Sequence, residues 1–362
     1  MTSHAEPDWP GTAGDGLLVL DGRAVRDLLT PAEAIDLMDR VFRDHSARRS
    51  RQPLRGVLTD DDAGALATMP AVVAGPDDDP AAGFGVKVMV IKPGNAKYGL
   101  GPHSGVVLVF DPATGAPSAV IDAVAVTAIR TAAASAAATR ALAVPGAGVL
   151  AVLGAGTQAR SHLAAMAEVL PALHEVRIWN RSPERALRLA DWARKTLPAL
   201  DVRCTADVGQ AARGAEVVCT TTSSSRPLLS AGMLAAGAHV NAIGASFRGK
   251  RELDASVVQR AGVFVDSRES ALNEADDLLI PLEEGLLTAD CIRAEIGEVL
   301  SGRHPGRTNA DELTVFKSLG IAAQDVAAGH LLQRRARQAG AGIRIPVIGV
   351  EPAAGTPEHP GT

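Results

Sequence analysis

The sequence predicts an α/β fold, in which a doubly wound parallel sheet is joined to a second, strand-rich α+β domain. Its 362 residues exceed what one hydrophobic core usually organises, so two domains are expected. Strand-like runs dominate before residue 129, whereas strand and helix patterns alternate from residue 148 onward. We therefore place a strand-rich domain first and a parallel sheet second.

The first domain is expected to span residues 17–129, after a disordered N-terminus at 1–16. Thr30 precedes Pro31 and Glu33, which together predict a capped helix start. Five short apolar runs follow, separated by Gly, Pro, Asn and Asp, and predict a mixed or antiparallel sheet. These runs are VLTD, ALATMPAVVA, GVKVMVIK, GVVLVFD and SAVIDAVAV.

The second domain is expected to span residues 130–320 and to open with an Ala-rich helix, RTAAASAAATRALA. The strand-like runs that follow recur about every 20 to 30 residues, as βαβ units require. They are VLAVL, VRIWN, DVRCT, EVVCTTT, HVNAIG and VFVDS. The segment DELTVFKSLGIAAQDVAAGHLLQRRARQAG has a helical pattern, so a helix at about 321–350 should complete the first domain, before a disordered tail at 353–362.

The composition favours a small-molecule partner. A net charge of −5, from 36 basic and 41 acidic residues, leaves no basic footprint for nucleic acid or an anionic membrane. Charged residues interrupt every long apolar stretch, so no membrane span is expected, and the N-terminus lacks a signal-peptide pattern. The three cysteines show neither disulfide nor zinc-ligand spacing, which fits the cytoplasm.

A glycine-rich turn predicts a dinucleotide site. Gly154, Gly156 and Ala159 form G-x-G-x-x-A between an apolar strand and a helical run. In a Rossmann-type domain the first glycine permits the tight turn, the second lets the backbone approach the pyrophosphate, and the helix N-terminus supplies N–H groups. The alternative is an ordinary strand-to-helix turn, but the βαβ context favours a dinucleotide.

The next strand end favours NADP(H), with NAD(H) as the other possibility. The acidic residue that usually holds the ribose hydroxyls of NAD is absent, and Asn180, Arg181 and Ser182 stand there instead. They could bind a 2′-phosphate, although Ser182 could equally be a helix cap and Arg181 a solvated charge. Thr221 and Thr222 follow another strand and are expected to face the cofactor crevice.

Three cations stand out by position. Lys87 lies inside an apolar strand, where it either lines a pocket or sits on a solvated face. Arg130 lies at the expected domain boundary, and with Arg55 it could hold the carboxylate of an amino or imino acid. For a single arginine, a solvated surface charge is the ordinary alternative.

Taken in order, eight segments resemble the ornithine cyclodeaminase/mu-crystallin family from about residue 17 to residue 350. They are QPLRGVL, MPAVV, GVKVMVIKPGN, GVVLVFDPATGAP, AIRTAAASAAAT, VLGAGTQA, IWNRSPERA and DELTVFKSLGIAAQD. The resemblance implies a homodimer formed through the strand-rich domain, a Rossmann domain for NAD(P), and an active site between the domains.

The resemblance also implies roles for individual residues. Arg55 and Arg130 resemble the carboxylate-binding arginines, and Lys87 resembles the active-site lysine, while Glu274 resembles a pocket glutamate with a surface acid as its alternative. His103 resembles a residue that contacts cofactor or substrate, with a solvated loop histidine as its alternative. The expected cofactor-binding residues are His103, Thr131, Gly154, Gly156, Thr157, Gln158, Asn180, Arg181, Ser182, Thr221, Thr222, Ser246 and Ser318.

One departure from the family pattern favours one reaction over another. Cyclodeaminases have an aspartate where this chain has Ser246, and a serine cannot act as an aspartate-like base without a partner. The resemblance is therefore closer to ketimine reductases and amino acid dehydrogenases, which transfer hydride between NADP(H) and the α-carbon of an amino or imino acid. The rivals are an ornithine or lysine cyclodeaminase and a non-catalytic NADP-dependent binding protein.

Overall fold

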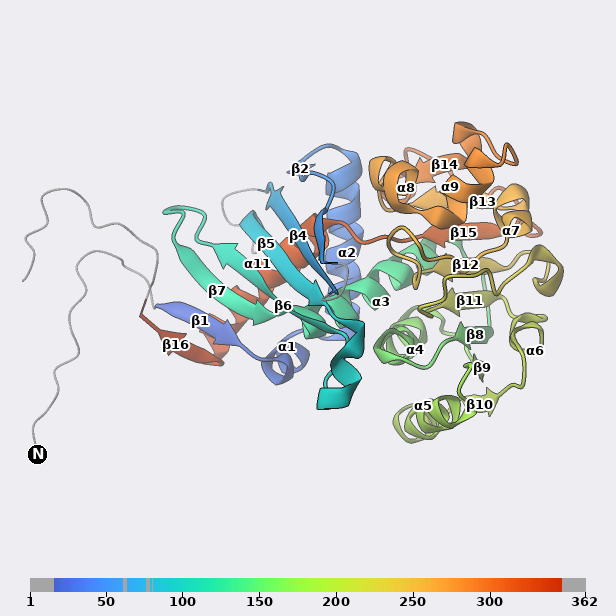
Figure 1. Ribbon diagram of the computed structural model, residues 1–362, viewed down its shortest axis with the longest axis horizontal. Helices are drawn as coiled ribbons and strands as arrows, with labels where there is room; N and C mark the ends of the chain where they lie inside the picture. Colours follow the sequence, from blue (N-terminus) through green and yellow to red (C-terminus); the bar gives the residue numbers. More distant parts are fainter. Residues whose placement is uncertain (1–15, 61–63, 76–78, 80, 347–362) are drawn as a thin grey trace, which may run out of the picture.

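The computed structural model describes residues 16–60, 64–75, 79 and 81–346 of the chain. Two sheets lie side by side along the long axis, with the long helix α3 (Ala123–Leu142) between them (Figure 1). The expectations for the N-terminus and for the tail at 353–362 fall outside the described residues, apart from Gly16. Within the described residues, no helix has the length and apolar character that a membrane crossing requires.

The first sheet is mixed, as the sequence predicted. Its strands β1 and β7 pair in parallel, and its other pairs are antiparallel. The order is β16 (Ile343–Ile345), β1 (Leu17–Leu20), β7 (Pro117–Asp122), β6 (His103–Phe110), β5 (Gly83–Ile91), β4 (Gly64–Val73) and β2 (Ser50–Arg51), with β3 (Gly56–Asp60) on β4. This sheet and its helices are called the strand-rich half.

The strand-rich half has helices on one face of its sheet. The helices are α1 (Gly22–Leu28), α2 (Pro31–Ser46) and α11 (Ala322–Ala339), and the short η1 (Pro93–Tyr98) joins β5 to β6. The predicted capping box of α2 is present, because Glu33 N donates to Thr30 Oγ1 and Thr30 N donates to the Glu33 carboxylate. Helix α11 packs along β4, β5 and β6, so one face of these strands is buried (Figure 1).

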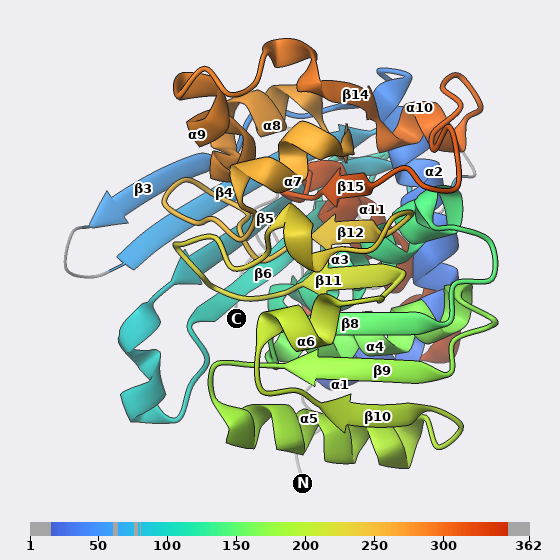
Figure 2. The same cartoon turned by 90° about the vertical axis from the view of Figure 1, so that its right-hand side faces the viewer.

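The second sheet is entirely parallel and confirms the predicted doubly wound architecture. Its order is β10 (Asp201–Cys204), β9 (Glu175–Trp179), β8 (Val149–Leu153), β11 (Val217–Thr220), β12 (His239–Ala242), β15 (Thr314–Lys317), β13 (Gly262–Val265) and β14 (Ile292–Glu295). The chain leaves β8 in one direction to β9 and β10, and then returns to β11 on the other side. A switch point therefore lies between β8 and β11 (Figure 2). In sheets of this type, ligands usually bind at such a point, beyond the carboxyl ends of the strands.

Short helices connect these strands. They are α4 (Thr157–Val169), α5 (Pro183–Thr196), α6 (Val208–Ala212), α7 (Ala255–Arg260), α8 (Arg268–Glu274), α9 (Asp276–Glu283) and α10 (Ile296–Leu300), with η2 (Ala231–Met233) and η3 (Ala289–Cys291). Together with the parallel sheet they form the parallel-sheet half.

Two sequence predictions were wrong around α3. The run AVAV was expected to continue a strand, but α3 begins at Ala123, because the Asp122 side chain accepts a hydrogen bond from Ala125 N and caps the helix there. Arg130 consequently lies inside the helix, whereas the sequence had suggested that it opens the helix. Apolar residues without polar spacing cannot separate a buried strand from a buried helix, which explains the error.

The segment at 311–340 was also assigned wrongly in part. Its residues Thr314–Lys317 form β15 in the middle of the parallel sheet, and only Ala322–Ala339 is helical. Buried on both faces, β15 has no alternation to reveal it, although Thr, Val and Phe favour strands. The chain then turns at Gly340 and pairs β16 with β1, so the helix does not extend to 350.

Candidate active site

The glycine turn after β8 has the geometry of a dinucleotide-binding loop. Gly154 has a φ of +120°, and a Cβ there would lie 2.7 Å from Thr221 Oγ1 and 2.8 Å from Thr221 O. A Cβ on Gly156 would meet nothing within 4 Å. Gly156 is the N-cap residue of α4, and no side chain caps the first N–H groups of this helix. The open space in front of unfilled first-turn N–H groups fits a pyrophosphate.

Asn180, Arg181 and Ser182 follow β9 beside this turn. Asn180 braces the turn, because its Oδ1 accepts from Ala155 N at 3.1 Å and its Nδ2 donates to Ser182 O at 2.9 Å. Ser182 occupies the N-cap position of α5 without a side-chain capping bond, and it donates its hydroxyl to Glu184 at 2.7 Å. Arg181 is exposed and has no ion-pair partner among the described residues, so its guanidinium is available to a ligand.

The predicted polar cradle at the strand ends is partly occupied by internal hydrogen bonds. Thr221 Oγ1 donates to Leu153 O at 3.2 Å, and Thr222 Oγ1 donates to Glu252 at 2.6 Å. Ser318 Oγ lies 3.3 Å from Asp266 Oδ2 and is 2% exposed. All three hydroxyl groups already donate their protons within the protein. These residues could therefore offer a ligand mainly their backbone groups and the lone pairs of their oxygen atoms.

Three further predicted residues lie where α3 meets α4. Thr157 is the exposed first residue of α4, and Gln158 donates its Nε2 to Thr127 O at 3.3 Å. Gln158 Oε1 is buried without a partner in the described structure. Thr131 is buried in α3, directly after Arg130.

A buried carboxylate unites two of the three predicted cations. Lys87 Nζ lies 2.7 Å from Asp325 Oδ2, and Arg130 Nε lies 3.0 Å from Asp325 Oδ1. Arg130 Nη1 also donates to Gln324 Oε1 at 2.9 Å. Lys87 and Arg130 are each 4% exposed, and Asp325 is fully buried. The side chain of Lys87 therefore faces α11, which excludes the solvated alternative for this residue.

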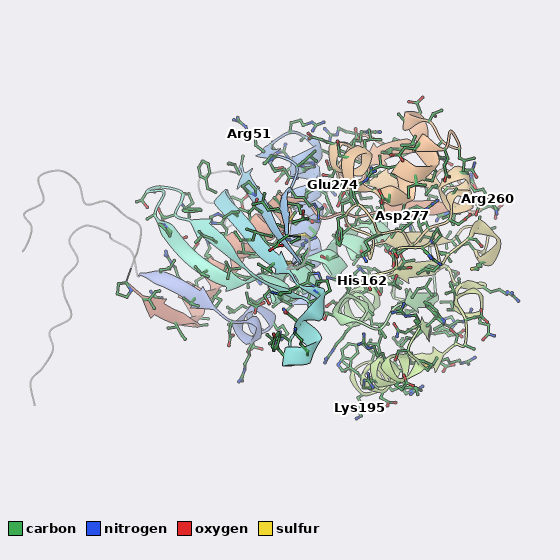
Figure 3. The ribbon with its side chains drawn as sticks, viewed as in Figure 1. Arg51, His162, Lys195, Arg260, Glu274 and Asp277 are labelled. Carbon is green, nitrogen blue, oxygen red and sulfur yellow. The ribbon has the colours of Figure 1, made fainter. Side chains whose placement is uncertain are left out.

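The third cation, Arg55, reaches across from the strand-rich half. Its Nε lies 3.0 and 3.1 Å from the two carboxylate oxygens of Glu274 on α8, and its Nη2 donates to Leu319 O at 2.9 Å and Gly320 O at 3.3 Å. Figure 3 labels Glu274 where α8 approaches the strand-rich half. A Cβ on Gly320 would lie 2.7 Å from Arg130 Nη1, so both arginines converge on Gly320.

Burial and neighbouring charges shift the pKa values in this cluster. Burial lowers the pKa of Lys87 to about 8, against the attraction of Asp325 and with the repulsion of Arg130 and Arg55. Asp325 has a lowered pKa, because Arg130 and Lys87 together outweigh the effect of its burial. Burial raises the pKa of Glu274 despite Arg55. The pKa of His103, the first residue of β6, is lowered by partial burial and by the charge of Lys87.

The sequence reasoning missed the residues that hold this cluster. Asp325 and Gln324 organise Lys87 and Arg130, and Asp266 Oδ2 accepts from Leu319 N at 2.7 Å and Gly320 N at 2.6 Å. A signal for Asp325 was available, since it is an isolated acid in the apolar run IAAQDVAAG. An ionised side chain inside an apolar stretch needs a partner, as Lys87 does.

Comparison with known proteins places this chain in a known family. The ornithine cyclodeaminase/mu-crystallin family profile matches residues 18–340. The ketimine reductase mu-crystallin of Mus musculus is 40% identical over 282 residues, which cover 78% of this chain and 84% of the mouse protein.

Two solved structures have the same fold over nearly their whole length. The Thermococcus litoralis Delta(1)-pyrroline-2-carboxylate reductase in complex with NADH and L-proline has a TM-score of 0.86 and 31% identity, covering 91% of this chain and 100% of that one. An archaeal alanine dehydrogenase dimer with bound NAD has a TM-score of 0.84 and 30% identity, covering 91% and 98%. By its sequence profile, its fold and its relatives, this chain belongs to the ornithine cyclodeaminase/mu-crystallin family.

Proposed function

We propose that this enzyme is a ketimine reductase, an oxidoreductase that acts on the C–N bond of an amino or imino acid with NADP(H). The observation that carries the proposal is the pair of buried cations, Lys87 and Arg130, on the single carboxylate of Asp325. Arg130 provides an anion-binding group, and Lys87, on the same carboxylate, provides a proton-donating group beside it. The related ketimine reductase and Delta(1)-pyrroline-2-carboxylate reductase support the same reaction class.

The arginines would hold the substrate carboxylate. Arg130 Nη2 and Arg55 Nη1 have no hydrogen-bond partner among the described residues, although the other donors of both side chains are engaged. A guanidinium that is held in place by some of its N–H groups and has another N–H group free is preorganised to bind a carboxylate. Convergence of both side chains on Gly320 would orient one carboxylate between the two halves.

Lys87 would supply the proton. The imine nitrogen takes a proton from the ammonium, while the nicotinamide, when bound, supplies the hydride to the α-carbon. In the reverse direction neutral Lys87 takes the proton from the amine. A pKa near the working pH suits a group that must exchange a proton in each cycle.

The parallel-sheet half would hold the cofactor. The turn at Gly154 and Gly156, with the unfilled N-terminus of α4, fits the pyrophosphate. Arg181 has no ion-pair partner in the described part of the chain, and no acid stands at the end of β9. Both observations support a 2′-phosphate and therefore NADP(H) over NAD(H). For Ser182 to donate to that phosphate, the exposed carboxylate of Glu184 would first have to turn away.

The test of this function is absorbance of the reduced nicotinamide while the protein is offered NADPH or NADH with a panel of cyclic imines and keto acid/amine pairs. Net oxidation of NADPH is the expected result. Ammonia release from ornithine or lysine without net cofactor change would establish a cyclodeaminase instead. Cofactor and imine binding without any turnover would establish a binding protein. Ser246, in place of the cyclodeaminase aspartate, favours the reductase.

The pH dependence should follow Lys87. Its pKa of about 8 means that the ammonium is present below that pH and is lost above it. The rate of imine reduction should therefore be high below about pH 8 and should fall as the pH rises through this value. The rate of amine oxidation should rise over the same range. Initial rates in both directions across this window check the sign, and a reduction rate that increased above pH 8 would contradict it.

Replacing Arg181 by alanine should raise the KM for NADPH about tenfold or more, because a charge-assisted contact to a phosphate is lost. The KM for NADH should change by less than about twofold. Steady-state kinetics with both cofactors measure the ratio, and Lys195→Ala, at the opposite end of α5, is the matched control. An equal rise in the KM values for NADPH and NADH would show that Arg181 does not bind the 2′-phosphate.

A second copy of the chain would cover the outer face of the first sheet. The strand register puts Leu58, Phe84, Val90 and Val106 on the face opposite Lys87, and their exposed fractions are 72%, 57%, 41% and 39%. A hollow of about 540 Å³ on this face includes Pro70, Val72, Phe84, Val86 and Phe110 in its lining. Exposed apolar surface of this extent marks an interface, and the dimeric alanine dehydrogenase supports a homodimer.

Replacing Leu58 by aspartate should therefore convert a dimer into a monomer, because a charge would be buried in the proposed interface. Light scattering after size exclusion measures the mass. Leu187→Asp is the matched control, since Leu187 is a leucine with 51% exposure on α5, far from this face. A wild-type monomer, or a Leu58→Asp dimer, would contradict this interface. A cytoplasmic location stays a prediction from the sequence.

A further inference from the structure

Three fully buried charged residues lie behind the carboxyl edge of the parallel sheet, away from the Asp325 cluster. They are Glu252, Asp277 and Lys317, each 0% exposed. Figure 3 labels Asp277 inside the parallel-sheet half. Burying an ion costs several kcal/mol unless its partners compensate. The arrangement of their partners shows what these charges hold in place.

Lys317 connects three separate elements. As the last residue of β15, it donates from Nζ to Asp277 Oδ2 on α9 at 2.8 Å and to Ala245 O at 2.5 Å. Ala245 belongs to the loop that follows β12 and carries Ser246. The ammonium therefore ties this loop to the centre of the sheet.

The two carboxylates bind backbone N–H groups of the segment that follows β12, and one N–H of the loop after β11. Asp277 Oδ1 accepts from Glu252 N and Leu253 N, each at 2.8 Å. The Glu252 carboxylate accepts from Gly244 N and Thr222 N, each at 2.7 Å. A Cβ on Gly244 would lie 1.9 Å from Thr222 O, so the loops after β11 and β12 pack together with no room for a side chain at Gly244.

This arrangement fixes the direction of one peptide group. The structure has no cis peptide bonds among its described residues, and in a trans peptide the C=O and N–H point to opposite sides. Because Ala245 O points to buried Lys317, Ser246 N–H points to the side away from Lys317. Ser246 is half-buried, and its N–H has no partner among the described residues. A cation on the carbonyl oxygen also polarises the peptide and strengthens the N–H as a donor.

We propose that Lys317 is a positioning residue for the cofactor, which holds the Ala245–Ser246 peptide so that Ser246 N–H donates to the carboxamide oxygen of nicotinamide. The inference rests on the proposed function. The β12 loop lies on the side of the switch point opposite β9, where the adenosine ribose is expected. The nicotinamide end is therefore the part of the cofactor that this loop would meet.

The test uses the full chain with the double substitution Lys317→Met and Asp277→Asn. Removing both charges avoids an unpaired buried ion, and the asparagine side chain keeps an oxygen that can accept from Glu252 N and Leu253 N. Calorimetry compares the dissociation constants of NADP⁺ and of 2′-phospho-ADP-ribose, which lacks nicotinamide. We expect NADP⁺ to bind about tenfold more weakly and the fragment to bind within about twofold of the wild type. The control is the exposed pair Lys195→Met and Asp191→Asn on α5.

Ser246→Pro gives a second readout if the double variant does not fold. Proline removes the N–H without touching the buried ions, so NADP⁺ should weaken while the fragment does not. Ser246→Ala keeps the N–H and should weaken NADP⁺ less than Ser246→Pro. Equal weakening of NADP⁺ and fragment, or unchanged NADP⁺ binding, would overturn the inference. A wild-type chain that binds neither ligand would overturn the proposed function and, with it, this inference.

Discussion

Replacing Lys87 by methionine is expected to lower kcat/KM for imine reduction by about 10²- to 10⁴-fold, the usual contribution of a positioned proton donor. Methionine fills a similar volume next to Asp325 but carries no proton to give. Binding of the cofactor should stay near the wild-type value, because the expected cofactor turn is in the other half. Stopped-flow or steady-state rates with the best imine of the panel, together with cofactor titration, measure both quantities.

A charged substitute separates proton donation from simple attraction. Lys87→Arg keeps a cation beside Asp325, yet a guanidinium does not give up its proton at these pH values. If Lys87 donates a proton, this variant should remain as slow as Lys87→Met and should lose the change in rate near pH 8. Restoration of the wild-type rate by Lys87→Arg would assign Lys87 a role in charge attraction alone. Lys195→Met, on the exposed face of α5 (Figure 3), serves as the control for removing a lysine charge.

Replacing Asp325 by asparagine should give the largest loss of stability of any single change at the site. The substitution leaves Lys87 and Arg130 buried without a counter-charge, and breaking a buried pair in this way costs about 3 to 5 kcal/mol. The pKa of Lys87 should fall further, because the attraction that raises it is removed. Urea denaturation measures the loss of stability. The fall in the pKa of Lys87 should appear as a shift of the high-pH limb of the rate profile to lower pH.

The surface pair of Asp191 and Arg194 gives the matched comparison. Their side chains are 65% and 48% exposed at a distance of 3.0 Å, so Asp191→Asn should cost less than about 1 kcal/mol. The double variant Lys87→Met with Asp325→Asn should lose less than the sum of its single losses, because the two residues interact directly. A loss below about 1 kcal/mol for Asp325→Asn would mean that Lys87 and Arg130 find other partners.

Local patterns in the sequence determined much of the fold. The βαβ alternation predicted the parallel sheet, the G-x-G-x-x-A turn predicted its glycine geometry at Gly154, and Thr30 predicted the start of α2. Each of these signals acts over a few residues, through a backbone angle or one hydrogen bond. The resemblance of eight ordered segments to a family added the cations as a set.

The tertiary structure alone decided which charges face one another. Asp325 is 238 residues from Lys87, and no local pattern relates a strand in one half to a helix that returns after the other half is complete. The same holds for β15, whose strand state depends on burial between β12 and β13, and for Lys317, whose ammonium meets Ala245 at a distance of 72 residues. A buried charge is desolvated and needs a compensating partner, and that partner is supplied by whichever residue the fold brings next to it. The sequence therefore determined which charged residues are available. The packing of the two sheets determined which of them interact.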